Sequence, residues 1–171
     1  MRNAPTGVER RFGPDELIVS KTDIAGRITY ANEVFMRVSG FTEDELIGAP
    51  HSLIRHPDMP RSVFHFLWQR IQSGKEIFAY VINLAKGGDH YWVFAHVTPS
   101  FDEHAKIIGF HSNRRVPREK PLAVMSDLYG ALRREEARHS DKASAVAAGT
   151  KLLVKSLESL GKSYDELMFA L

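Results

Sequence analysis

The sequence contains no cysteine among its 171 residues. Disulfide bonds, thiolate metal ligands, cysteine nucleophiles and covalent links between a thiol and a cofactor are therefore all excluded. The eight histidines are scattered and show no HExxH or CxxCH spacing, so the pattern predicts no zinc site. Whatever chemistry the chain carries must come from other residue types.

The sequence also lacks long apolar runs and a strong net charge. No run approaches the roughly 20 apolar residues that span a bilayer, and the N-terminus has no apolar signal-peptide core. The 23 Lys and Arg residues almost balance the 21 Asp and Glu residues, which leaves a charge of +2. We therefore expect a cytoplasmic protein with no membrane insertion and no nucleic-acid partner.

The residue pattern that is present predicts an α+β domain of about 100 residues with a single antiparallel sheet. Residues 17–23 and 27–30 read as a first hairpin, and residues 77–84, 90–98 and 106–115 as three later strands. Short helices are predicted between the two groups. Asn32 is the predicted cap of the first, Thr42 and Glu45 form a capping box for the second, and residues 60–73 form the longest helix.

The ends of the chain differ in character from this central part. Residues 1–16 hold prolines, glycines and charges and are predicted to be a loose N-terminal arm. Residues 17–116 form the predicted domain. Residues 117–171 are predicted to be a C-terminal helical extension, with helices near 121–139 and 141–160 and a capping box at Ser163 and Glu166. The run Arg133–Arg134 is interpreted as a solvated helical face.

One stretch concentrates polar chemistry next to aromatic residues. Residues 55–60 read Arg-His-Pro-Asp-Met-Pro, and Phe64 and Trp68 follow one helical turn apart. A cation, an imidazole and a carboxylate are thus adjacent to two flat rings. This combination indicates the rim and wall of a pocket for a planar, anionic cofactor.

These and other motifs resemble a known family. The matching segments are Tyr30-Ala31-Asn32, residues 38–41, residues 55–60, Phe64, Trp68, Asn83 and residues 88–93 (Gly-Asp-His-Tyr-Trp-Val). Over residues 17–115 the chain resembles a PAS domain, and more narrowly the flavin-binding PAS domain of bacterial aerotaxis, or energy-taxis, transducers. The resemblance implies the PAS fold, with its antiparallel sheet flanked by short helices.

The resemblance also implies a noncovalently bound FAD whose redox state reports oxygen or respiratory status. It places eight residues at the flavin: Asn32, Arg55, His56, Asp58, Phe64, Trp68, Asn83 and Tyr91. Arg55 and His56 would contact the phosphates, with Asp58 as their organiser or as a helix cap. Aromatic rings suit the flavin faces, and the Asn83 amide suits its polar edge.

The residue types by themselves leave alternatives open. Phe64, Trp68 and Tyr91 are also consistent with core packing, and His56 with an ordinary turn. A cofactor-free PAS module for docking or dimerisation is one rival function, and a haem gas sensor with His65 or His90 as ligand is another. A small flavin-dependent oxidoreductase is a weaker rival, because no substrate-handling acid–base pair is apparent. We therefore expect no enzymatic activity.

A sensor needs an output. No membrane segment and no long signalling coiled coil follows residues 17–116. The expected output is therefore a chemoreceptor-like or other signalling protein acting in trans, or a homodimer. The C-terminal helices are expected either to pack on the sheet or to pair with a partner.

Overall fold

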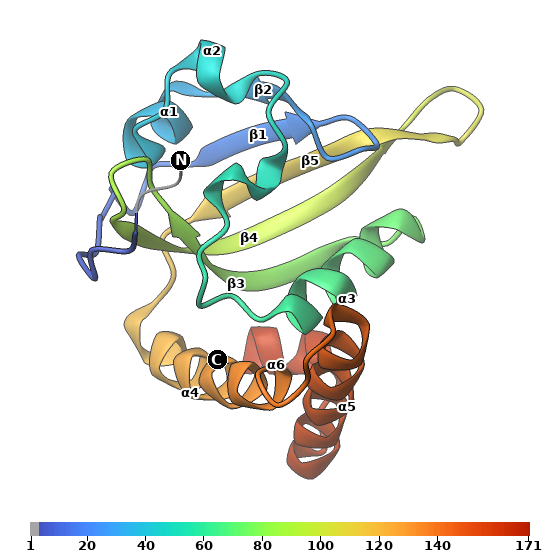
Figure 1. The fold of residues 1–171 in the computed structure, drawn as a ribbon. Coiled ribbons are helices and arrows are strands. Elements are labelled where there is room, and N and C mark those ends of the chain that lie inside the picture. Colours follow the sequence, from blue (N-terminus) through green and yellow to red (C-terminus); the bar gives the residue numbers. More distant parts are fainter. Residues whose placement is uncertain (1–3) are drawn as a thin grey trace. The chain divides into compact units, whose positions relative to one another are not determined.

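A computed structural model describes residues 4–171 of the chain. These residues divide into two compact units (Figure 1). The first, called here the sheet unit, comprises residues 4–56 and Ile71–Pro117. The second, the helical unit, comprises Pro57–Arg70 and Arg118–Leu171. Residues 57–70 thus cluster with the C-terminal helices, whereas the sequence pattern grouped them with the strands.

The sheet unit is built on one antiparallel sheet of five strands with the order β2-β1-β5-β4-β3 (Figure 1). The strands are β1 (Ile18–Thr22), β2 (Ile28–Ala31), β3 (Ile77–Leu84), β4 (His90–Phe101) and β5 (Ile107–Arg115). This arrangement confirms the predicted α+β class and the single antiparallel sheet.

Strand β4 is longer than the sequence pattern predicted, because it includes Pro99, Ser100 and Phe101, which were expected in a loop. Pro99 pairs with Phe110 of β5. On the other side of β4, the pairing with β3 ends at Val97. Pro99 therefore lies where β4 has no β3 neighbour, and its missing N–H leaves no ladder bond unmade on that side.

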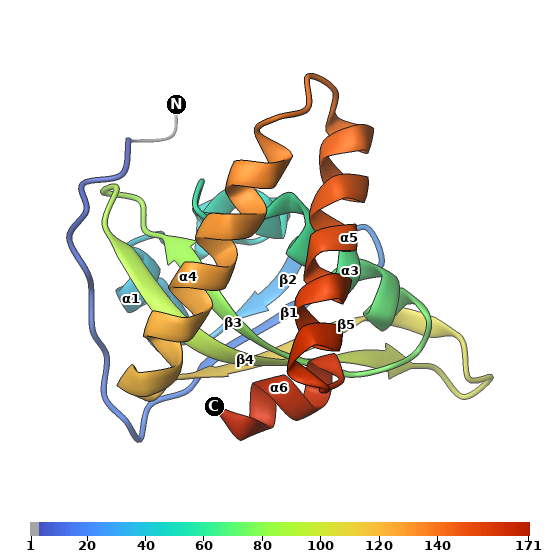
Figure 2. The same ribbon diagram turned by 90° about the horizontal axis from the view of Figure 1, so that it is seen from below.

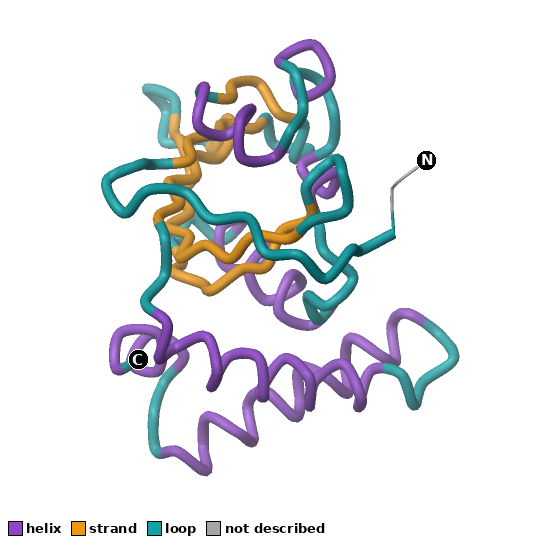
Figure 3. The backbone as a smooth tube through the Cα atoms, turned by 90° about the vertical axis from the view of Figure 1, so that its left-hand side faces the viewer, coloured by secondary structure: helices purple, strands orange, loops and turns teal. Residues whose placement is uncertain are grey.

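Three short helical segments follow the first hairpin: α1 (Glu33–Ser39), α2 (Glu43–Leu46) and the 3-10 helix η1 (His51–Ile54). Asn32 caps α1, and the Glu45 carboxylate accepts a 3.0 Å hydrogen bond from the Thr42 N–H, so both predicted caps are confirmed. Helix α1 packs on β1 and α2 on β2 (Figure 3). Their buried side chains include Phe35 and Leu46, both fully inaccessible to solvent.

The N-terminal arm is tied to the turn between β3 and β4 rather than loose, so that expectation was wrong for its described part. The Thr6 and Arg10 N–H groups donate to the carbonyls of Gly88 and His90 at 2.9 and 2.7 Å. Arg10 also pairs with Asp89 at 2.9 Å. Gly88 has a φ of 97°, and a Cβ there would collide with the Ala4 carbonyl, so the turn needs glycine.

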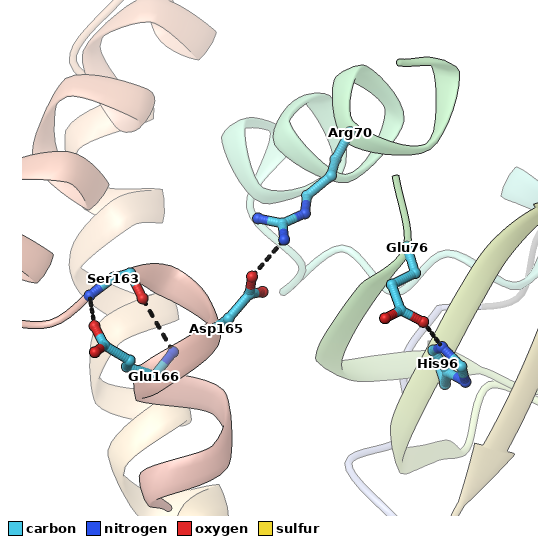
Figure 4. Close-up of polar contacts among 6 residues, drawn as sticks. All are labelled: Arg70, Glu76, His96, Ser163, Asp165 and Glu166. Carbon is cyan, nitrogen blue, oxygen red and sulfur yellow. Dashed lines mark hydrogen bonds and ion pairs between the residues drawn. The ribbon is translucent and has the colours of Figure 1, made fainter. Parts of the chain in front are cut away.

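The helical unit contains most of α3 (Arg61–Gln72) together with α4 (Glu119–Glu136), α5 (Lys142–Leu160) and α6 (Tyr164–Ala170). Helices α4 and α5 run side by side in opposite directions (Figure 2). Ser163 and Glu166 form the predicted capping box of α6 (Figure 4). None of the helices within residues 4–171 combines the length and apolar character needed to cross a bilayer.

A buried carboxylate joins the C-terminal helices to the start of α3. Glu136, only 8% exposed, accepts hydrogen bonds from the Arg61 N–H, the Ser62 N–H and the Ser62 hydroxyl at 2.9, 2.9 and 2.7 Å. A carboxylate at this position accepts hydrogen bonds from N–H groups that have no partner within the helix. Its negative charge also interacts favourably with the positive end of the helix dipole. Glu136 therefore caps α3 from α4.

Two ion pairs reinforce this connection within the helical unit. Asp58 pairs with Arg133, and Arg70 pairs with Asp165 (Figure 4 shows the second pair). The ring of Phe66 packs against that of Tyr164, with centroids 4.8 Å apart. Arg133 was expected on a solvated face, which its 43% exposed side chain confirms, and its ion pair with Asp58 lies on that face.

We predict that Gly149→Ala destabilises the protein whereas Gly130→Ala does not. A Cβ at Gly149 would lie 2.6 Å from Ser62 Oγ and 2.8 Å from Glu136 Oε1, so it would push apart the buried cap. Overpacking of this kind costs about 1–3 kcal/mol of unfolding free energy. Urea denaturation measures this difference directly.

Gly130 provides the matched control, because it lies inside α4 and a Cβ there meets only the end of the Arg134 side chain, at 3.4 Å. Alanine should therefore stabilise that position by about 0.5–1 kcal/mol through its helix propensity. Equal effects of the two substitutions would contradict the close packing described at Glu136.

Candidate functional site

The first two residues of the Arg55–Pro60 motif, Arg55 and His56, belong to the sheet unit. Arg55 follows η1 and forms an isolated antiparallel bridge with Asn83 of β3. The structure thus brings together two predicted site residues that are 28 positions apart in the sequence. His56 is 4% exposed, and its ring meets that of His90 edge-on with centroids 5.9 Å apart.

Asn83 and Tyr91 form a second predicted pair that the structure brings together. They lie directly opposite each other on β3 and β4, so their side chains share one face of the sheet. Their exposed fractions are 3% and 0%. The Asn83 Nδ2 and the Tyr91 hydroxyl have no hydrogen-bond partner. Burial raises the pKa of the Tyr91 phenol, which therefore stays a neutral hydroxyl donor.

Asn32 has a structural role in the same unit. Its Oδ1 accepts hydrogen bonds from the Val19 and Phe35 N–H groups, both at 3.0 Å. Its Nδ2 donates to the Leu17 carbonyl at 2.8 Å. The amide therefore fixes the start of β1 to the start of α1. Its contact with a cofactor stays a prediction.

The remaining predicted residues, Asp58, Phe64 and Trp68, belong to the helical unit. Asp58 pairs with Arg133, a partner the sequence did not suggest. On α3, Val63 and Leu67 are buried, whereas Phe64 and Trp68 are only half-buried. Phe64 and Trp68 are therefore less buried than Val63 and Leu67 of the same helix. Their contact with a cofactor stays a prediction.

Sequence reasoning missed a fully buried cation at the end of β5. Arg114 is 2% exposed and donates through Nη2 to the hydroxyl of Ser20 on β1. Its guanidinium carbon lies 4.6 Å from the centroid of the Phe35 ring. Its Nε and Nη1 have no partner. The available signal was weak: Arg114 occupies the same strand face as the buried Phe110, four residues earlier.

The surroundings of Arg114 are neutral. His51 Nε2 lies 3.4 Å from Ser20 Oγ, and burial, helped by the charge of Arg114, lowers the pKa of His51 to about 3. Burial also lowers the pKa of Arg114, to about 10, so the guanidinium stays protonated at neutral pH. In the described part of the chain, no three His, Asp or Glu side chains come together as a metal site requires.

The arrangement suits a polar ligand better than a catalytic reaction. Four unpartnered polar atoms on Asn83, Tyr91 and Arg114 are buried within one unit, and all four can donate a hydrogen bond. Buried polar groups are nearly always satisfied in native proteins, so such a set calls for an explanation. Acceptor atoms of a bound molecule would satisfy these donors.

Comparison with known proteins gives this geometry a context. A family model described as the PAS fold matches residues 28–114. The aerotaxis receptor of Escherichia coli K12 is 42% identical over 118 residues, which are 69% of this chain and 23% of that receptor. A nitrogen fixation regulatory protein of Klebsiella pneumoniae is 28% identical over 89 residues, 52% of this chain and 18% of the relative. The chain therefore spans less than a quarter of either relative.

Solved structures show the same fold at low sequence identity. The light-state structure of the blue-light photoreceptor Aureochrome1 LOV superposes with a TM-score of 0.58 at 17% identity, covering 68% of this chain and 91% of that one. A light-oxygen-voltage domain studied with a flavin analogue gives a TM-score of 0.56 at 16% identity, covering 72% and 87%. These likenesses confirm the predicted fold.

The neutral state of His51 predicts that the protein loses stability as the pH falls. The pKa of this histidine is about 3 in the folded state, below its ordinary value of 6.5. The unfolded chain therefore binds a proton that the folded chain does not, between about pH 6.5 and pH 3. Over this window His51 should remove up to about 1.4 kcal/mol of stability per pH unit. Urea unfolding at a series of pH values measures the slope.

His51→Gln removes the titrating group and keeps a polar atom near Ser20, so it should flatten part of this slope. His104→Gln is the control, because His104 is exposed in the turn between β4 and β5. A His51→Gln variant with the slope of the wild type would contradict the description of His51 as half-buried and neutral.

Proposed function

We propose, since this chain belongs to the PAS fold family, that its sheet unit binds FAD noncovalently and that the protein is a redox or oxygen sensor. PAS domains are sensory signalling modules rather than enzymes. The single observation that carries the proposal is the group of unpartnered donors on Asn83, Tyr91 and Arg114. A flavin offers acceptor atoms on its pyrimidine edge and on its phosphates.

The residues that would hold the cofactor divide by chemistry. Asn83 and Tyr91 would bind the polar edge of the ring, because an amide and a neutral hydroxyl both donate hydrogen bonds. Arg55 and His56 would lie on the phosphate side. The family resemblance implies that Phe64 and Trp68 also contact the flavin, where aromatic stacking is worth about 0.5–1.5 kcal/mol beyond the buried area.

The choice of FAD and of a redox signal has two supports. The resemblance of residues 17–115 to flavin-binding aerotaxis sensors favours FAD, and the E. coli relative is itself an aerotaxis receptor. The absence of cysteine excludes a covalent cysteinyl–flavin adduct as the signal. When bound, FAD would supply reversible two-electron redox chemistry.

The motif offers a route for the signal. Arg55 and His56 belong to the sheet unit, and two residues later Asp58 is ion-paired with Arg133 of α4 in the helical unit. A change in the contacts of Arg55 or Asn83 would be passed along the chain to Asp58 and the start of α3. Glu136 holds that start, so α4 would respond with it.

The output would be read by another protein. Aerotaxis, or energy taxis more broadly, is the process that the E. coli relative suggests. We propose that a chemoreceptor-like or other signalling protein acts in trans in the cytoplasm, with a homodimer as the alternative arrangement.

The absorption spectrum of the purified protein tests this proposal. We expect a yellow preparation with flavin bands, which releases FAD when the protein is denatured by heat or acid. Chromatography of the released cofactor distinguishes FAD from FMN. A Soret band would establish the haem alternative instead. A colourless protein that cannot be reconstituted with FAD would favour the cofactor-free interaction module.

Substitutions on the motif and on α3 test the residue assignments. Trp68→Ala and Arg55→Ala should lower the FAD content of the purified protein while circular dichroism stays unchanged. His65→Ala is the matched control, because His65 is exposed on the same helix, three residues before Trp68. His65 is also a candidate ligand of the haem alternative. Full FAD content in both Trp68→Ala and Arg55→Ala would contradict the assignment of these two residues to the cofactor site.

A further inference from the structure

The interior of the sheet unit holds a buried positive charge without a counter-ion. The contacts of Arg114 are a hydroxyl and an aromatic face: Nη2 donates to Ser20 Oγ, and the guanidinium lies over Phe35. Within residues 4–171, no carboxylate pairs with Arg114. Its closest titratable neighbours, His51 and Tyr91, are neutral at physiological pH.

Such an arrangement is costly in a folded protein. An ionised side chain that leaves water without a partner loses several kcal/mol of solvation unless a charge or hydrogen bonds replace it. Ser20 and the Phe35 ring replace only part of this solvation, because Nε and Nη1 of Arg114 still have no acceptor. The Nε–H points to the edge shared with Nη2, whereas Nη1 lies on the edge toward Cδ, so the two groups donate in different directions and each needs an acceptor of its own.

We propose that Arg114 is the internal anion-binding residue of the sheet unit, and that its unpartnered N–H groups donate to negatively charged acceptor atoms of the bound cofactor. This assignment rests on the proposed function and extends it, because neither the sequence motif nor the family resemblance pointed to Arg114. The acceptor is either a phosphate of FAD or the pyrimidine edge of the flavin, where negative charge gathers on reduction. Both present anionic oxygen to a guanidinium.

A purely structural role makes the opposite prediction about stability. If Arg114 served only to join Ser20 and Phe35, its loss would weaken the ligand-free protein. If instead Arg114 is an anion-binding residue, its charge is uncompensated in the flavin-free protein. Replacing it with methionine then removes this buried charge and fills the space with a flexible apolar side chain. The flavin-free Arg114→Met protein should then unfold at the same urea concentration as the flavin-free wild type, or at a higher one.

The test is a titration of the flavin-free full chain with FAD, FMN and riboflavin, followed by flavin fluorescence. Arg114→Met should weaken FAD binding by about 10- to 100-fold, the usual effect of losing hydrogen bonds to a charged group. Arg114→Lys should fall in between, because lysine keeps the charge but has fewer donors and lacks the fixed planar directions of the guanidinium. Arg115→Met is the matched control, since Arg115 is the next residue of β5 and is exposed.

The three flavins distinguish the two possible acceptors of Arg114, a phosphate and the flavin ring. An affinity loss for FAD and FMN with none for riboflavin would assign Arg114 to a phosphate. An equal loss for all three would assign it to the ring. Unchanged binding of all three by Arg114→Met, or a large loss of stability in the flavin-free variant without a specific loss of affinity, would overturn the assignment. A wild-type protein that binds none of them would overturn the proposed function, and the assignment with it.

Discussion

The interior of the sheet unit is governed by the placement of one charged side chain, Arg114, away from water. Its charge, acting with burial, keeps His51 neutral, and its Nη2 uses the hydroxyl of Ser20. Together with Asn83 and Tyr91, it leaves four buried donor atoms without acceptors. The proposed anionic cofactor would supply acceptors for these donors, which docking onto another protein would not explain.

The Arg55–Pro60 motif is divided between the two compact units. Its first half belongs to the sheet unit through the bridge between Arg55 and Asn83, and its second half belongs to the helical unit through Asp58 and Arg133. Glu136 caps the helix that the motif begins. A motif that is covalently shared between two compact units is well placed to carry a change in one unit to the other.

The sequence was sufficient for local features and insufficient for distant ones. Strand β3 followed from its continuous apolar run and its length, and the caps at Asn32, Thr42 and Ser163 followed from side-chain chemistry that acts within three residues. Arg114 could not be found in this way, because its significance lies in contacts with β1 and α1, distant in the sequence. The cap by Glu136 was hidden for the same reason, since Ser62 is 74 positions away.

We propose that the buried donors of the sheet unit bind a noncovalent flavin, and a crystal structure of the protein with FAD tests this proposal. Flavin or phosphate oxygens, or ring nitrogens, should lie within hydrogen-bond distance of the Asn83 amide, the Tyr91 hydroxyl and the unpartnered N–H groups of Arg114. A flavin bound elsewhere, with these donors still unpartnered or satisfied by water alone, would contradict it.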